Sequence, residues 1–166
     1  MPNQEPADSV DEIVTAWKRE RPDLDFAPLH IFSRVWRLSK HLDHARQSSF
    51  RSSELHSWEF DVLSALRRAG SPYQLSPKAL LEQTMVSSGT MTNRIDRLVS
   101  HGLVERRTDP HDGRGILVMM TIEGLQRVDA AITEHVTSES ELLVNLSAAD
   151  QERLAALLRK LSRDFG

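Results

Sequence analysis

The chain has 166 residues, contains no cysteine and carries a formal net charge of −3. This length allows one domain with a buried core, with or without appended helices, so the fold needs no disulfide. The lack of cysteine excludes a disulfide framework, a thiol nucleophile and a cysteine metal site. No apolar run approaches the roughly 20 residues that span a bilayer, and the acidic N-terminus does not resemble a signal peptide. The sequence therefore predicts a soluble cytoplasmic protein with no membrane partner.

The net charge argues weakly against a nucleic-acid-binding protein, because such proteins are often basic. The charge is uneven, however. Between Ser87 and Arg114, five arginines stand against four acidic residues. Because whole-chain charge governs solubility and long-range steering, it does not exclude local contacts with phosphates.

Two helices are predicted in the N-terminal part, one over about residues 10–21 and one from Pro28 to about Gln47. Ser9 is the predicted N-cap of the first helix, and Glu12 would complete a capping box. The first helix carries an apolar stripe at helical spacing, which consists of Val10, Ile13, Val14 and Trp17. Such a stripe must be buried against another element.

A helix-turn-helix followed by a hairpin is predicted in the central part. A helix from Ser53 to Ala69 precedes a short helix over residues 77–84, for which Ser76 is the N-cap and Pro77 the first helical residue. A further helix begins after Ser87 or Ser88 and ends at residues 101–102. Residues 103–107 and 116–121 read as two strands joined by the turn TDPHDG. This order predicts a winged helix-turn-helix.

Two helices are predicted in the C-terminal part, one of about two dozen residues from Ile122 and one capped by Ser147. The fold class is therefore mostly α with a small β-hairpin wing. We expect three segments: N-terminal and first dimerisation helices over 1–52, a DNA-binding domain over 53–121 and C-terminal dimerisation helices over 122–166. The apolar faces at both ends of the chain are most simply buried against a twin subunit, which predicts a symmetric homodimer.

The helix after Ser87 has two chemically different faces at 100 degrees per residue. Its predicted buried stripe consists of Met91, Ile95 and Leu98. The opposite row consists of Thr90, Asn93 and Arg97. Short side chains allow close approach to DNA, and Asn and Arg make bidentate contacts with base edges. An ordinary capped surface helix is the alternative, but the helix-turn-helix context favours the DNA interpretation.

Two further features suit phosphate and groove contacts. Ser87 and Ser88 place hydroxyl groups and free backbone N–H groups at a helix N-terminus, where a phosphate can bind. Arg114 lies near the predicted tip of the hairpin, where an arginine can enter a minor groove, and Asp112 can hold its direction. The alternative is a connector with solvated charges.

The segment from Ser53 to Gly124 resembles the MarR family of bacterial winged-helix regulators. The stretch DGRGILVMMTIEG is similar to the wing signature of that family, Asp-x-Arg followed by a strand that ends in Leu-Thr-x-x-Gly. Met120 stands in place of the usual Leu, and Gly113 stands where relatives often carry another arginine. The resemblance implies an obligate dimer that binds a palindromic operator in double-stranded DNA, usually to repress a neighbouring gene.

A narrower resemblance is to the urate-responsive PecS/HucR-like subgroup. It is carried by Trp17 on the added helix and by the stretches EFDVLSALRRAG, MTNRIDRL and LVERR. The subgroup uses a Trp, an Asp, an Arg on the recognition helix and an Arg shortly after it. The resemblance assigns the ligand-binding role to Trp17, Asp61, Arg94 and Arg106, with urate or a similar small organic anion as the effector.

Elementary chemistry agrees with a site at Arg94. This residue lies roughly 60 degrees from the buried stripe, at the edge of the core. A charge there needs a partner, and Asp61 is a candidate. Arg106 could complete a basic pocket, with Trp17 as a flat wall. An organic anion would then compete with Asp61 for Arg94. The alternative is a structural Asp61–Arg94 ion pair, with Trp17 packing its own helix.

Other functions have less support. His41 and His44 are three residues apart without a third metal ligand nearby, and no nucleotide-binding loop, metalloprotease motif or nucleophile elbow is present. We therefore expect no enzyme, no metal and no cofactor. The predicted function is a ligand-responsive DNA-binding regulator, a repressor released by a small organic anion such as urate. Two rival interpretations remain. The first is a winged helix that binds DNA but responds to no small molecule, and the second is a winged helix that serves only to bind another protein.

Overall fold

The computed structural model describes residues 6–84, 86–110, 112–113 and 115–165. The chain forms two compact units, Met1–His44 and Ala45–Gly166. The divisions predicted after residues 52 and 121 concern function, and they stay predictions.

The first unit contains α1 (Ser9–Glu20) and most of α2 (Ala27–Arg51). Val10 and Val14 on α1 are buried together with Phe26, and Leu29 packs against them. Two members of the predicted α1 stripe are thus buried, whereas Ile13 and Trp17 keep much of their surface exposed.

The N-cap of α1 is Asp8, so the prediction of Ser9 is wrong by one residue. The Asp8 carboxylate accepts hydrogen bonds from the backbone N–H groups of Val10 and Asp11, at 2.8 and 3.1 Å. Asp11 completes a capping box by accepting the N–H of Asp8 at 3.0 Å. Asp and Ser cap helices about equally well, and Asp8 has the further advantage of a cationic partner, Arg34.

The cap of α1 makes stability within the first unit depend on pH. The hydrogen bond from Arg34 is the main cause that lowers the pKa of Asp8 to about 2, below the ordinary value of 3.8 for an aspartate. A lowered folded-state pKa gives a stabilisation that is complete above the unfolded value and is lost as pH falls towards the folded value. Asp8→Asn should therefore be less stable than the parent at pH 6, and the difference should vanish between about pH 4 and pH 2. Urea unfolding at stepped pH measures it, and a difference that persists at pH 2 would contradict the assignment.

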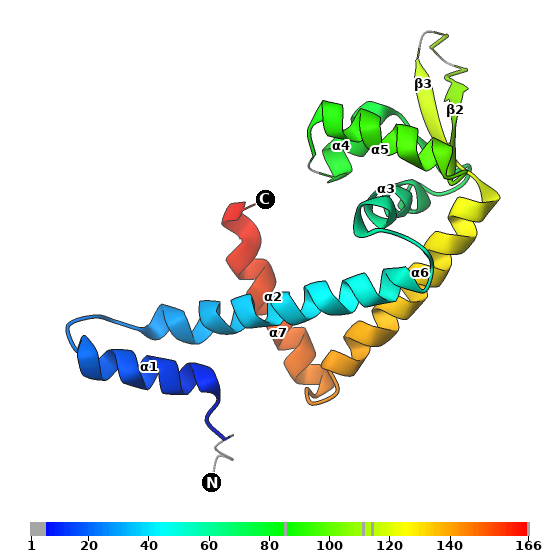
Figure 1. Cartoon of the computed structure of the whole chain (residues 1–166). Helices are drawn as coiled ribbons and strands as arrows, with labels where there is room; N and C mark the ends of the chain where they lie inside the picture. The colour runs from blue at the N-terminus through cyan, green and yellow to red at the C-terminus, as the bar shows by residue number, and fades with distance from the viewer. Residues whose placement is uncertain (1–5, 85, 111, 114, 166) are drawn as a thin grey trace. The chain divides into compact units, whose positions relative to one another are not determined.

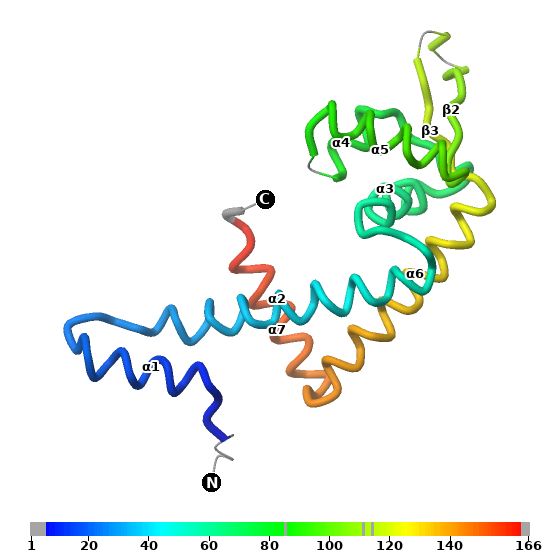
Figure 2. Tube along the Cα trace, in the orientation of Figure 1, coloured from blue at the N-terminus to red at the C-terminus, as the bar shows by residue number. Residues whose placement is uncertain are grey.

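The second unit has the predicted order of helices and hairpin, and one further short strand completes a three-stranded antiparallel sheet. Figure 1 shows the hairpin strands β2 and β3 beside α5. After the end of α2 come α3 (Ser57–Arg68), β1 (Gln74–Leu75), α4 (Pro77–Thr84), α5 (Ser88–Ser100), β2 (Val104–Thr108), β3 (Ile116–Met120), α6 (Ile122–Leu142), α7 (Ala148–Leu161) and a 3-10 turn (Ser162–Phe165). The sheet order is β1-β3-β2, and β2 and β3 form the hairpin. Figure 2 traces α6 as one continuous helix that follows this hairpin.

The boundary between α2 and α3 differs from the prediction. The second helix continues to Arg51, and α3 begins at Ser57 rather than Ser53. Residues 52–54 turn between them, with Glu54 at a positive φ of 53°. The start of α3 is fixed by Glu59, whose carboxylate accepts the backbone N–H of His56 at 2.8 Å. The two-residue strand β1 was also not predicted, because it is too short to show a pattern.

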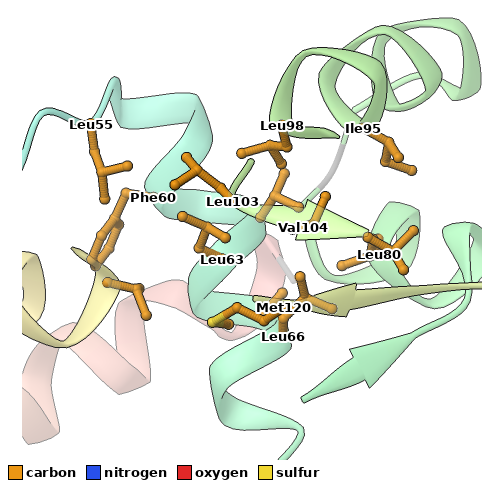
Figure 3. Packing of buried hydrophobic residues seen from close by; sticks show 14 of the residues in the cluster. Leu55, Phe60, Leu63, Leu66, Leu80, Ile95, Leu98, Leu103, Val104 and Met120 are labelled. Atoms are coloured by element: carbon orange, nitrogen blue, oxygen red, sulfur yellow. The ribbon is translucent and has the colours of Figure 1, made fainter. Parts of the chain in front are cut away.

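The core of this unit joins the helix-turn-helix to the hairpin and α6 (Figure 3). The predicted stripe of α5 is confirmed, because Met91, Ile95 and Leu98 are at most 2% exposed. Leu98 shares the core with Leu63 of α3 (Figure 3). This packing leaves the opposite side of α5 open to solvent.

Thr121 and Gly124 fix α6 to the residues that directly follow α5. The Thr121 hydroxyl donates to the carbonyl of Gly102 at 2.8 Å and accepts the N–H of Gly124 at 3.0 Å. The Thr121 N–H donates to the carbonyl of Leu103 at 3.1 Å. The Thr-x-x-Gly pattern seen in the sequence is therefore the N-cap of α6, packed directly on the backbone that follows α5.

Candidate ligand and DNA-binding site

The N-terminus of α5 is exposed and capped as predicted. The Ser87 hydroxyl accepts the backbone N–H of Thr90 at 3.3 Å and lies 2.8 Å from the Thr90 hydroxyl. Ser88 is the first residue of the helix, and its carbonyl accepts the Thr92 hydroxyl at 3.1 Å. These small groups leave the helix end open to an approaching phosphate. Their contact with DNA stays a prediction.

Asn93 and Arg97 lie on the exposed side of α5, but Arg97 has an aromatic neighbour that the helical wheel does not reveal. The guanidinium carbon of Arg97 lies 4.7 Å from the centre of the Trp58 ring. That of Arg94 lies 5.9 Å from the same ring. Two arginines of the predicted recognition helix thus share one tryptophan of α3.

A cavity of about 470 Å³ lies beside this tryptophan. Its walls are formed by Gln47, Arg51, Leu55, His56, Ser57, Trp58, Asp61 and Arg94. Asp61 and Arg94, two of the four residues predicted to bind a ligand, therefore line one cavity. The lining combines an aromatic surface, two guanidinium groups and one carboxylate, which suits a planar anion of small size.

The ion pair considered between Asp61 and Arg94 does not form. Asp61 instead accepts a hydrogen bond from Arg46 near the end of α2, while the Arg94 guanidinium lies over Trp58. The two partners of the Arg46–Asp61 pair are 37% and 39% exposed, so solvent screens their attraction and the pair contributes about 1 kcal/mol or less to stability. The partner of Arg94 is therefore aromatic rather than acidic.

Arg106 and Trp17 lie elsewhere than on the walls of this cavity. Arg106 on β2 donates to Asp96 of α5 at 2.6 Å. Trp17 belongs to the first unit, where its ring stacks on Phe26 with the ring centres 6.1 Å apart. The ligand-binding roles of both residues rest on the resemblance and stay predictions.

The tip of the hairpin is only partly described. Arg114 lies outside the described residues, so its predicted entry into the minor groove is not addressed by the structure. The exposed Asp112 contributes its backbone carbonyl, which accepts the N–H of Gly115 at 2.7 Å. A second hydrogen bond, from the N–H of Asp109 to the Gly115 carbonyl at 2.9 Å, closes the turn.

Trp58 and His56 are site residues that the sequence reasoning missed. Trp58 is only partly buried and lines the cavity, and the His56 ring stacks on it with the ring centres 6.4 Å apart. A signal was present, since Trp58 precedes Asp61 by three residues and positions i and i+3 share a helix face.

The buried acid Glu59 links α3 to the end of α5. It is only 1% exposed, and its carboxylate lies 2.7 Å from Nδ1 of His101, the C-cap of α5. The other carboxylate oxygen accepts the N–H of His56. Both carboxylate oxygens are thus satisfied, which a buried acid requires.

The helix-turn-helix, the exposed face of α5 and the hairpin that follows it define a winged-helix DNA-binding protein. The model of the MarR family matches residues 53–115. The chain is 34% identical to the transcriptional regulator PecS of Dickeya dadantii over 93% of each chain. On this evidence the chain belongs to the MarR family, and it resembles the PecS subgroup.

Two solved structures show the same fold. A variant of Escherichia coli MarR in complex with operator DNA matches with a TM-score of 0.68 and 27% identity, over 93% of this chain and 99% of that chain. Bordetella bronchiseptica BpsR, described as regulated in DNA binding by 6-hydroxynicotinic acid, matches with a TM-score of 0.66 and 26% identity, over 80% of this chain and 93% of that chain.

The chain is a DNA-binding transcriptional regulator and not an enzyme, as the relatives show. None of the helices in the described part of the chain has the length and apolar character needed to cross a membrane. Across the same residues, no group of three His, Cys, Asp or Glu side chains could hold a metal ion.

Proposed function

We propose that the protein is a dimeric repressor that leaves its palindromic operator when a small planar organic anion, urate or a similar molecule, binds beside Trp58 and Arg94. The observation that carries the proposal is the position of Arg94. This residue lines the cavity and also belongs to α5, the helix predicted to read DNA. A ligand held by Arg94 therefore acts directly on the DNA-binding element.

Charge and shape favour an anionic, planar ligand. Arg51 and Arg94 supply two positive charges to the cavity walls, and Arg46 neutralises Asp61 from outside the lining. A planar anion can lie against the Trp58 ring while its oxygen atoms accept hydrogen bonds from a guanidinium. The regulation of BpsR by 6-hydroxynicotinic acid, a planar aromatic acid, supports the same class of ligand.

The proposed release mechanism follows from the contacts of Arg94. Without ligand, its guanidinium lies over Trp58 of α3. An anion that bonds to Arg94 draws the side chain towards the cavity and shifts α5 relative to α3. In this proposal Arg106 also contacts the bound anion, as the subgroup resemblance implies, and the ligand-binding role of Trp17 is proposed from that resemblance alone. Arg106 must then exchange its bond with Asp96 for one with the ligand.

In the proposed DNA complex, α5 enters the major groove. Thr90, Asn93 and Arg97 face the bases, and the hydroxyl groups of Ser87 and Ser88 bind a phosphate. Arg114, oriented by Asp112, enters the flanking minor groove.

The homodimer is proposed because apolar side chains of the terminal helices lie exposed. On α7, Leu154, Leu157, Leu158 and Leu161 are each at least 40% exposed, although they form one face. In α2, Phe32, Val35 and Trp36 are also exposed. Apolar surface of this kind marks a site of association.

Leu157→Glu should therefore produce a monomer that binds the operator weakly, because a carboxylate on this face cannot be buried without a partner. Light scattering coupled to size exclusion measures the mass. Ala155→Glu, an exposed position about 200 degrees around α7 from Leu157, is the matched control and should remain dimeric. A monomeric parent, or a dimeric Leu157→Glu variant, would contradict the proposed assembly.

The test of function is fluorescence anisotropy on the intergenic DNA beside the protein's own gene, titrated with urate and then with 6-hydroxynicotinate. Salt-dependent, sequence-selective binding of the parent is expected. Release by either anion supports the proposed ligand class, and comparison of the two anions shows whether urate or the related acid is the better effector. Tight binding that no anion disturbs would favour a DNA-binding protein without a ligand, and no specific binding would favour a protein-interaction module.

A further inference from the structure

Trp58 lines the cavity and also contacts α5 through two of the arginines of that helix. Its ring lies 4.7 Å from the guanidinium carbon of Arg97 and 5.9 Å from that of Arg94. Tryptophan has the most favourable aromatic face for a cation, and contact extends to about 6 Å from the ring centre. Both arginines are therefore within range of one ring.

The ring itself is held in place. Trp58 packs against the core of the second unit, and the His56 ring stacks on it with an angle of 13° between their planes. His56 is in turn bound through its backbone N–H to the buried Glu59, at 2.8 Å. The same Glu59 contacts His101 at the end of α5. Trp58 is thus a fixed surface close to the helix that presents Arg97.

Arg97 needs such a surface if it is to read a base. An arginine side chain has many rotamers, and a base contact must remove that rotamer entropy upon binding. A guanidinium that already lies against a ring loses less entropy, and its N–H groups stay available for hydrogen bonds in the plane. The exposed position of Arg97 on α5 leaves those groups accessible.

We propose that Trp58 is the residue that positions Arg97 for specific DNA recognition, and that it is also the surface through which an occupied cavity acts on Arg97. The proposal rests on the proposed function, because it takes Arg97 to be a base-reading residue. Trp58 lines the cavity, so a ligand stacked on it changes the surface that supports Arg97. Trp58 itself need not touch DNA.

A double-mutant cycle tests this role. Trp58→Leu should weaken operator binding roughly three- to thirtyfold, because the cation–aromatic contact is lost. Binding to an unrelated duplex, and the dependence of binding on salt, should change little, because they report phosphate contacts. In the Arg97→Ala background the same Trp58→Leu change should have little further effect on operator binding. Trp58→Phe, which keeps an aromatic face, should retain part of the affinity.

Two controls and the contradicting outcomes separate this proposal from others. Thermal unfolding shows whether Trp58→Leu remains folded, and Trp58→Phe keeps the test valid if the leucine variant does not. Equal losses on operator and unrelated DNA, or additive effects of Trp58 and Arg97 substitutions, would assign Trp58 a structural role and overturn the proposal. Failure of the proposed function gives a result that differs from both of these. In that case the parent would show no preference for the operator, or Arg97→Ala would bind the operator as tightly as the parent does.

The coupling to the cavity has its own readout. If saturating urate or 6-hydroxynicotinate releases the parent, the interaction between Trp58 and Arg97 measured by the cycle should fall towards zero in its presence. If the Trp58–Arg97 interaction energy is the same with and without the anion, this second part of the proposal is overturned, while the positioning role of Trp58 stays intact.

Discussion

Replacing Gly124 with alanine is expected to destabilise the second unit by about 3 kcal/mol, the upper end of the usual cost of overpacking. A Cβ atom at this position would lie 2.2 Å from the carbonyl oxygen of Leu103 and 3.0 Å from the side chain of Met120. The nearer atom belongs to the backbone, so no rotation of a side chain relieves the clash. The gain from alanine in a helix, about 1 kcal/mol, is too small to compensate.

The expected change in midpoint temperature is a fall of about 6–12 °C for a chain of this size. Thermal unfolding followed by circular dichroism, at equal protein concentrations, measures it. Gly89→Ala is the matched control, because a Cβ at this helical position has no atom within 4 Å. It should leave stability unchanged or raise it slightly. A Gly124→Ala variant as stable as the parent would show that α6 does not pack on Leu103 in this way.

Replacing Asn93 with alanine is expected to reduce operator affinity about 5- to 150-fold, the range for loss of one bidentate base contact. Asn93 is exposed on the side of α5 opposite the buried stripe, so its removal should not affect folding. Because an uncharged side chain releases no counterions, the dependence of binding on salt should stay the same.

The measurement is anisotropy on operator and on unrelated DNA, each at several salt concentrations. Ser100→Ala is the control, since Ser100 is also exposed on α5 but lies at its C-terminal end, where its hydroxyl bonds to the Arg97 carbonyl at 2.7 Å. Equal losses for both variants, or an Asn93→Ala variant that still distinguishes the operator, would contradict the proposed orientation of α5 on DNA.

The winged-helix fold could be predicted because local signals agreed with it. Ser76, Ser87 and Ser147 occupy the cap positions expected from the sequence. The spacing of Met91, Ile95 and Leu98 places α5 on the core with one face free. The start of α3 was placed too early because its cap depends on Glu59, a buried side chain, rather than on a typical N-cap residue.

The candidate site could be predicted only in part, because its contacts join residues far apart in the sequence. Spacing places Arg94 at the flank of α5, and Asp61 and Arg94 do line one cavity. Spacing does not indicate that Arg46 takes Asp61 as its partner, or that Trp58 turns towards Arg94 and Arg97. These pairings are set by how α2, α3 and α5 pack, and helix periodicity carries no information about that.

The most direct test of the account is release of the parent and of Arg94→Gln from the operator by a panel of small anions that includes urate, 6-hydroxynicotinate and salicylate. The concentration of each protein is first set, from its own affinity, so that the labelled DNA is saturated. Arg159→Gln on α7 serves as the charge-matched control. The account predicts that at least one planar anion releases the parent and the control at similar concentrations, and that Arg94→Gln requires at least about tenfold more, since loss of a charged hydrogen bond costs roughly 1.5–3 kcal/mol. A parent that stays on the operator at saturating concentrations of every anion, or an Arg94→Gln variant released as easily as the parent, would contradict it.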